Sequence, residues 1–183
     1  MSEHHHHIAV LAGDGIGPEV MAQALKVLDA VSGKFGFTVS RKEAFVGGAG
    51  IDHCGKALPE ETIRACEEAD AVLFGSVGGP KWENQPGSNR PEAGLLKIRK
   101  SLGLFANLRP CLLFSELASA CPLKTEISEK GFDMLIMREL TGGLYFGERR
   151  TSEVDGVMTA VDTLSYNEKE IRRLMKTVDK INA

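Results

Sequence analysis

The sequence has few cysteines and no long apolar run. None of Cys54, Cys66, Cys111 and Cys121 belongs to a C-x-x-C pair, which argues against a zinc or redox motif and predicts buried, reduced thiols. No apolar run approaches the roughly 20 residues that a membrane span needs, and no signal-peptide pattern is present. We therefore expect a cytoplasmic protein.

The sequence also lacks an excess of positive charge. Its 22 basic and 25 acidic residues give a net charge of −3, which argues against nucleic acid or an anionic membrane as the main partner. No internal repeat or low-complexity linker is present. With 43% hydrophobic residues, the 183-residue chain can form the core of one domain or of two small ones.

The first part of the chain alternates between strand-like and helical patterns. Apolar segments at 7–12, 37–46 and 71–77 are typical of strands, and the last is continuous enough for a strand covered on both faces. Helical patterns begin at Pro18, with Val20, Ala24, Leu25, Leu28 and Val31 on one face, and at Pro59. This order predicts an α/β fold with a parallel or mixed sheet.

The second part has a different pattern. A short helix at 92–102 is followed by strand-like segments at 105–114 and 133–140. Residues 143–166 alternate and turn like a β-hairpin arm, and residues 167–183 have a helical pattern that Asn167 caps.

Glycine is concentrated in three segments. Residues 13–17, "GDGIG", lack the third glycine of the Rossmann fingerprint because Pro18 follows, so they predict a strand-to-helix turn, where small residues and a helix N-terminus favour phosphate or ribose oxygens. Residues 46–52, "VGGAGID", predict a second turn. The loop at 78–91 contains three glycines and three prolines, and we expect it to bind a ligand and not merely to connect elements.

The histidine tract at the start has two interpretations. His4 to His7 could chelate nickel or zinc, but such a tract is more often a purification-tag remnant or a frayed chain end.

Three arginines and a tyrosine stand among apolar, strand-like residues. Arg99, Arg109, Arg138 and Tyr145 have no matching acidic cluster nearby in sequence. Because guanidinium groups suit carboxylate oxygens, they predict a site for a small di- or tricarboxylic acid. The alternative is that each arginine pairs with a separate carboxylate of the fold.

Four ordered motifs give the chain a family resemblance. "AGDGIGPEV", "FGSVGGPKWE", "RPEAGLLKIRKSLGLFANLRP" and "MRELTGGLYFGE" resemble signatures of the isocitrate/isopropylmalate dehydrogenase family, over about Ile8 to Ile171. The resemblance implies an α/β fold with a mixed sheet and flanking helices that binds NAD without a Rossmann domain. Residues 1–100 would begin the large NAD-binding domain. Residues 101–183 would form part of a smaller substrate domain, with a hairpin arm (144–163) that forms a homodimer.

The resemblance also assigns roles to residues. Glu92 would bind a ribose diol, which favours NAD over NADP, and Leu95 would contact the isopropyl group of the substrate. Tyr145 would be the general acid, and Lys180 is either the catalytic lysine or an exposed helix lysine. The implied cofactor residues are Gly15, Ile16, Gly78, Gly79, Pro80, Lys81, Trp82, Glu83 and Glu92, and the implied substrate residues are Leu95, Arg99, Arg109 and Arg138.

The resemblance implies NAD-dependent oxidative decarboxylation of 3-isopropylmalate to 2-oxoisocaproate in leucine biosynthesis, with Mg²⁺ or Mn²⁺. The aspartates that hold the metal in the family lie further on, so we expect no metal ligand in these 183 residues. Beyond Glu170 the sequence departs from the family pattern. A tartrate/D-malate dehydrogenase and a truncated fragment that only binds a ligand or a partner subunit are alternatives. Leu95 argues against isocitrate, because a third carboxylate beside a leucine would be costly.

Overall fold

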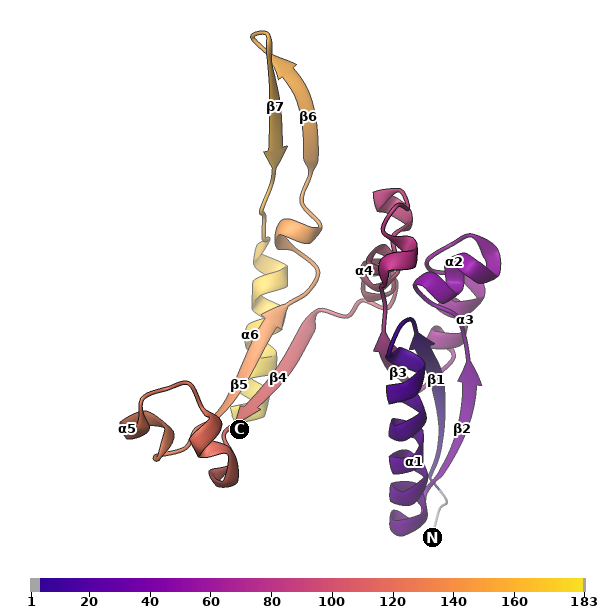
Figure 1. The fold of residues 1–183 in the computed structure, drawn as a ribbon, viewed down its shortest axis with the longest axis vertical. Coiled ribbons are helices and arrows are strands. Elements are labelled where there is room, and N and C mark those ends of the chain that lie inside the picture. Colours follow the sequence, from indigo (N-terminus) through magenta and orange to yellow (C-terminus); the bar gives the residue numbers. More distant parts are fainter. Residues whose placement is uncertain (1–3, 183) are drawn as a thin grey trace. The chain divides into compact units, whose positions relative to one another are not determined.

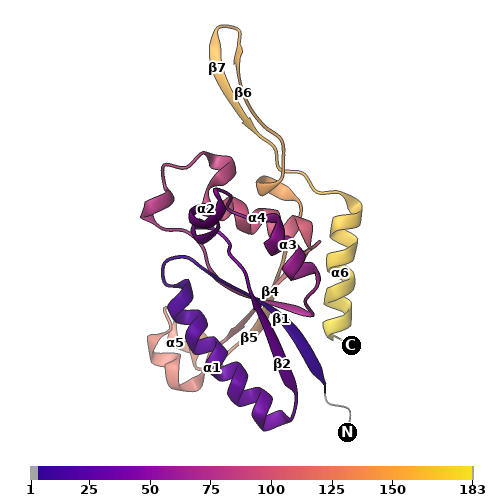
Figure 2. The ribbon, with the colours of Figure 1, turned by 90° about the vertical axis from the view of Figure 1, so that its right-hand side faces the viewer.

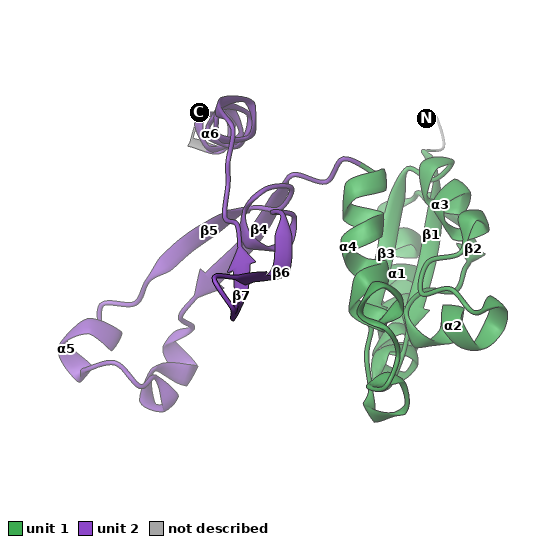
Figure 3. Ribbon diagram, turned by 90° about the horizontal axis from the view of Figure 1, so that it is seen from above, with its two compact units in different colours: residues 1–102 green, residues 103–183 purple. Residues whose placement is uncertain are grey.

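The computed structural model describes residues 4–182, which form two units, one ending at Leu102 and the other beginning at Gly103 (Figures 1 and 3). The elements of the first unit are β1 (His5–Gly13), α1 (Gly17–Phe35), β2 (Thr38–Glu43), α2 (Gly48–Cys54), α3 (Glu60–Glu67), β3 (Ala71–Ser76), the 3-10 turns η1 (Pro80–Trp82) and η2 (Gly87–Asn89), and α4 (Pro91–Ser101).

The sheet of the first unit is parallel, with β1 between β2 and β3. Ala9 and Leu11 of β1 are fully buried and belong to the hydrophobic core. This arrangement confirms the α/β class. The expectation that β3 is covered on both faces was wrong: β3 lies at one edge of this sheet and is partly exposed, so β1 is the strand with the continuous buried run.

Helix α1 begins and ends where its sequence signals predict. Pro18 lies in its first turn, and Gly36 ends it with φ +71°, a left-handed conformation that glycine adopts without strain. The predicted inner face was partly wrong, because Val20 and Val31 are exposed. No helix within residues 4–182 is long and apolar enough to cross a membrane.

Histidines of the N-terminal tract belong to the sheet. Strand β1 begins at His5, and His5 to His7 pair with Thr38 to Ser40 of β2. The rings of His5 and His7 both contact the Ser40 hydroxyl. For these three residues the frayed-end interpretation was therefore wrong; residues 1–3 lie outside the described residues.

The cysteines differ in burial, contrary to expectation. All four thiols are free, but only Cys66 is buried, while Cys54 is exposed. Burial raises the pKa of the Cys66 thiol, and the negative charge of Glu67 adds to this effect. A core position is the better description of Cys66 than a reactive one.

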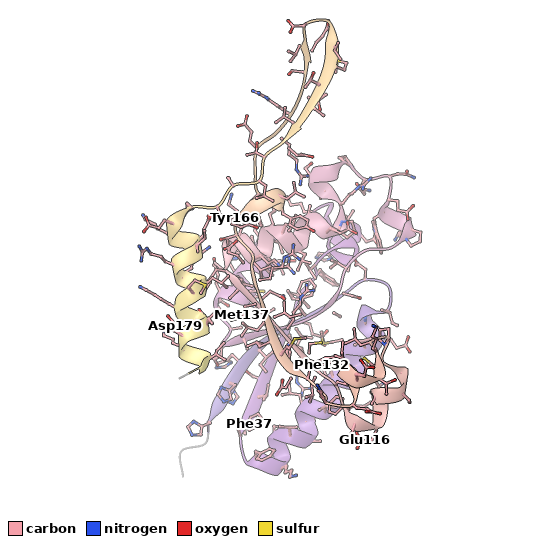
Figure 4. All side chains as sticks on the ribbon, turned by 90° about the vertical axis from the view of Figure 1, so that its left-hand side faces the viewer. Phe37, Glu116, Phe132, Met137, Tyr166 and Asp179 are labelled. Atoms are coloured by element: carbon pink, nitrogen blue, oxygen red, sulfur yellow. The ribbon has the colours of Figure 1, made fainter. Side chains whose placement is uncertain are left out.

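The second unit consists of two antiparallel strand pairs, a short helix and a longer C-terminal helix. Its elements are β4 (Ala106–Leu112), η3 (Ser115–Ala120), α5 (Thr125–Ser128), β5 (Asp133–Glu139), η4 (Gly143–Tyr145), β6 (Arg149–Val154), β7 (Val157–Asp162) and α6 (Glu168–Asn182). Strands β6 and β7 form the predicted hairpin, which projects beyond the start of α6 (Figures 1 and 2). Helix α6 packs against β5. Tyr166 lies just before the start of α6 and Asp179 toward its other end (Figure 4).

A buried carboxylate joins α6 to β5. Glu139, whose side chain is 7% exposed, accepts hydrogen bonds from the backbone of Thr141 and Gly142 and pairs with Arg173 at 3.0 Å. Burial by itself would raise the pKa of Glu139, but the hydrogen bonds from Thr141, Gly142 and Arg173 outweigh it, so that the pKa is lowered. The Glu139 carboxylate therefore fixes the turn that leads to Tyr145 and ties it to α6.

We expect Glu139→Gln to destabilise the second unit by about 2 kcal/mol at neutral pH, because a charged acceptor is lost from a buried network. A lowered pKa means that the carboxylate contributes stability above its unfolded-state pKa, and that this contribution is lost as pH falls through the folded-state value. The difference in the free energy of unfolding between the variant and the parent should therefore be smaller at about pH 3 than at neutral pH. Urea denaturation at neutral pH and at about pH 3 measures this difference. Glu168→Gln, at an exposed glutamate, is the control. An equal difference at both pH values would contradict the assignment.

Candidate functional site

The turn after β1 joins three segments of the first unit through one side chain. The Asp14 carboxylate, 4% exposed, accepts hydrogen bonds from the backbone N–H groups of Gly48 at 2.6 Å, Ala49 at 2.6 Å and Gly78 at 3.0 Å. Its own backbone N–H donates to the Ser76 carbonyl at 2.7 Å. The "GDGIG" turn, the start of α2 and the loop after β3 are thereby held together.

Asp14 also explains an unpredicted helix. Residues 46–52 were expected to form a turn, but α2 begins at Gly48, and Gly47 before it has no side chain to cap the helix. The Asp14 carboxylate binds the first two N–H groups of α2 in place of a local cap. Sequence reasoning missed Asp14, and its position directly after a buried strand was the available signal.

A small cavity in the loop after β3 contains most of the predicted cofactor residues. Its volume is about 150 Å³, and it is lined by Gly79, Pro80, Trp82, Glu83, Arg90, Pro91 and Glu92. Gly78 lies against Glu92: a Cβ at Gly78 would be 2.9 Å from the Glu92 carboxylate, and the φ of +111° also requires glycine. Gly15 faces the Gly78 carbonyl, whereas Ile16 is 63% exposed and outside the lining.

Lys81 and Trp82 have a partner in α2. The Lys81 ammonium donates to Asp52 at 2.6 Å, and the Trp82 indole N–H donates to the other oxygen at 3.2 Å. The hydrogen bond from Lys81, followed by that from Trp82, lowers the pKa of Asp52. Both predicted cofactor residues therefore also have a structural task, which ties the cavity loop to α2.

Three residues of α4 that were predicted to bind cofactor or substrate lie in a stripe along one face of the helix. Glu92 lies in its first turn, and Leu95 and Arg99 follow at intervals of three and four residues, which share a helix face. Leu95 is half-buried and packs against the core. The stripe leads from the cavity residue Glu92 to the predicted substrate residues.

The strand register of the second unit gathers the other two arginines. Asn107 pairs with Arg138 and Arg109 with Ile136, so all four side chains lie on one face of the β4–β5 pair. The Arg138 guanidinium lies over the Tyr145 ring at 5.3 Å, and Arg109 donates to the Asn107 amide oxygen at 2.6 Å. Within residues 4–182 neither guanidinium forms a salt bridge, so this face can accept an anion.

Comparison with known proteins decides the family. The sequence model of the isocitrate/isopropylmalate dehydrogenase family matches residues 7–181. The chain belongs to this family. It is 57% identical to a 3-isopropylmalate dehydrogenase of Pseudoalteromonas translucida (96% of this chain, 49% of that protein) and 57% identical to one of Haemophilus influenzae (93% and 48%). It thus spans about half the length of these curated relatives.

Two solved structures with the same fold are named as dehydrogenases. An isocitrate dehydrogenase from Methylococcus capsulatus matches with a TM-score of 0.73 and 25% identity, over 94% of this chain and 46% of that one. A beta-decarboxylating dehydrogenase from Thermococcus kodakarensis matches with a TM-score of 0.63 and 32% identity, over 94% and 44%.

The remaining expectations concern the metal site and the predicted catalytic lysine. Within residues 4–182, no three His, Cys, Asp or Glu side chains are grouped so that they could hold a metal ion. Lys180 is exposed in the last turn of α6, which continues as a helix through "VDKIN". Because α6 binds Glu139, whose side chain points away from the face that carries Arg138, Lys180 lies on the other side of the strand pair.

We expect Lys81→Met to raise the pKa of Asp52 towards its ordinary value, because the largest cause of the lowering is removed. Trp82 is the single tryptophan and bonds to Asp52, so its fluorescence reports this titration. The midpoint of the emission change on acidification should move to higher pH. Lys26→Met on α1 is the control, since the Lys26 ammonium bonds to Gln23 on the same helix and not to Asp52. An unshifted midpoint in Lys81→Met would refute this assignment.

Proposed function

We propose that the chain is part of an enzyme that oxidises and decarboxylates 3-isopropylmalate to 2-oxoisocaproate with NAD, a reaction of leucine biosynthesis. The observation that carries the proposal is the face of β4 and β5 that holds both Arg109 and Arg138, with Tyr145 under Arg138, and where within residues 4–182 neither arginine forms a salt bridge. The 57% identity to 3-isopropylmalate dehydrogenases supports the choice of substrate. The unit up to Leu102 begins the NAD-binding domain, and the unit from Gly103 belongs to the substrate domain.

The cofactor is held by the loops around Asp14. Gly15, Gly78 and Gly79 allow the backbone to approach NAD closely, and Glu92 accepts hydrogen bonds from a ribose diol. A carboxylate at this place disfavours the additional phosphate of NADP. When bound, NAD supplies a hydride acceptor for the 2-hydroxyl carbon of the substrate.

The arginines bind the substrate carboxylates, and Tyr145 supplies a proton. Loss of carbon dioxide from the oxidised substrate leaves an enolate, whose negative charge the guanidinium groups stabilise. The Tyr145 hydroxyl then donates a proton to the enolate carbon and completes the keto acid. The stacking of Arg138 on the Tyr145 ring keeps the acid at the same face as the cations.

As the hydride leaves, a base accepts the proton of the substrate 2-hydroxyl, and in the proposed homodimer this base is Lys180 of a second copy of the chain. Within its own protomer Lys180 lies on the Glu139 side of the β4–β5 pair, so the arginine face that it serves is that of the second copy. The β6–β7 arm is suited to that contact, because Val157 and Met158 are 64% and 69% exposed and an isolated hairpin is marginally stable.

A second candidate is a chain that binds NAD, carboxylate or a partner subunit without turnover. It is favoured by the finding that residues 4–182 contain no group of side chains suited to a metal ion, since Mg²⁺ or Mn²⁺ is the family expectation. A tartrate/D-malate dehydrogenase remains the alternative substrate assignment.

The test is NADH formation from NAD, Mg²⁺ and 3-isopropylmalate, with D-malate and isocitrate in parallel. Turnover of 3-isopropylmalate in preference to the other two establishes the proposed reaction. A preference for D-malate reassigns the substrate. A folded sample that binds NAD but forms no NADH identifies the second candidate.

We expect Leu95→Ser to reduce the ratio of kcat/KM for 3-isopropylmalate to that for D-malate by about tenfold or more, because burying the isopropyl group contributes roughly 2 kcal/mol. Steady-state kinetics on both substrates measures the ratio. Leu96→Ser is the matched control, since Leu96 is also half-buried in α4 but lies off the stripe of Glu92, Leu95 and Arg99. An unchanged ratio in Leu95→Ser would exclude contact with the isopropyl group.

A further inference from the structure

We propose that Asp14 is a positioning residue of the cofactor site, which holds the cavity loop in its binding conformation through backbone N–H groups. The proposal rests on the proposed NAD site for its functional part. Its structural part rests on the Asp14 contacts alone.

Asp14 is bound by backbone amides, not by a cation. Within residues 4–182 no Lys, Arg or His pairs with it, and the N–H groups of Gly48, Ala49 and Gly78 occupy both carboxylate oxygens. A buried carboxylate needs such partners, because an unpaired charge away from water is costly. Asp14 is not among the residues that line the cavity, so it acts on the cavity through the loops that it binds.

Two points in the first part of the cavity loop depend on these bonds. Gly78 donates to Asp14 directly, next to Gly79 of the lining. Four residues on, the Trp82 ring packs so closely on Gly48 that a Cβ at Gly48 would clash with it, and Gly48 also donates to Asp14. A single side chain thus holds the loop at Gly78 and, through Gly48, at Trp82.

The loop conformation needs an external partner of this kind. Gly47 and Gly78 have φ of +70° and +111°, conformations that glycine permits but does not select over others. Neither residue has a side chain that could fix its own backbone. Gly78 donates to Asp14, and so does Gly48 next to Gly47. The Gly47 N–H donates to the Ala57 carbonyl at 2.8 Å. Together these bonds select the two conformations from the many that glycine allows.

The first experiment needs no ligand. Amide hydrogen exchange is compared in the unmodified chain, in Asp14→Asn and in Asp29→Asn, a matched change at an exposed aspartate that pairs with Arg41. In Asp14→Asn the amides of Gly48, Ala49 and Gly78 should exchange at least about tenfold faster. The exchange rates of the β1 amides should not change. Acrylamide quenching of Trp82 should increase in the same variant only.

The second experiment measures NAD binding by titration against Trp82 fluorescence. Asp14→Asn should weaken NAD binding about tenfold while the affinity for 3-isopropylmalate stays within about twofold. An equal loss of affinity for NAD and for 3-isopropylmalate would overturn the positioning role, and so would an unchanged affinity for NAD. If the unmodified chain binds no NAD, the cofactor assignment fails, and the exchange experiment still decides whether Asp14 holds the loop.

The unmodified chain provides a measurement in case Asp14→Asn does not fold. The Gly78 amide should then be protected from exchange in the parent protein, although it belongs to a loop, and the neighbouring Gly79 amide should exchange faster. Equal exchange of Gly78 and Gly79 would overturn the proposal.

Discussion

The arrangement of the first unit depends on the hydrogen bonds between one buried carboxylate and three backbone amides. Strands β1 and β3 are parallel, so their carboxyl ends meet at one edge of the sheet, where α/β proteins commonly bind ligands. Asp14 follows β1 at that edge and binds the loop after β3. The close contact requires glycine: a Cβ at Gly13 would clash with the Ser76 carbonyl. Glycine provides the space, and Asp14 selects the conformation.

In the second unit, the alternation of side chains along β5 has the corresponding role. Arg138 and Glu139 are adjacent in sequence and therefore point to opposite faces. Glu139 binds Arg173 of α6 and fixes the turn towards Tyr145, while Arg138 lies over the Tyr145 ring. One face of the strand pair thus serves stability and the other is available for an anion. A shift of one residue in register would exchange the two faces.

Local patterns predicted the elements, and long-range contacts decided what those patterns missed. The limits of α1 follow from Pro18 and Gly36, which act within a few residues of the helix. Helix α2 was missed because its cap, Asp14, is 34 residues away in sequence. His5 joins the sheet because β2 pairs with it, which no tract of histidines indicates by itself. The arginine site could be proposed from residue types, whereas the placement of Arg109 and Arg138 on one face of the strand pair required the strand register.

Helix α4 shows why charge alone could not assign the site. Glu92 in the first turn and Arg99 in the last turn both complement the helix dipole, so each would stabilise α4 without any ligand. Leu95 between them has no such explanation. Ile98 is 3% exposed and fills the core, whereas Leu95 is only half-buried, although burial of a leucine is favourable. A leucine that keeps apolar surface uncovered beside an acid and a cation fits a ligand with an apolar group and polar ends. The proposal of a substrate at this stripe therefore depends more on Leu95 than on Glu92 and Arg99.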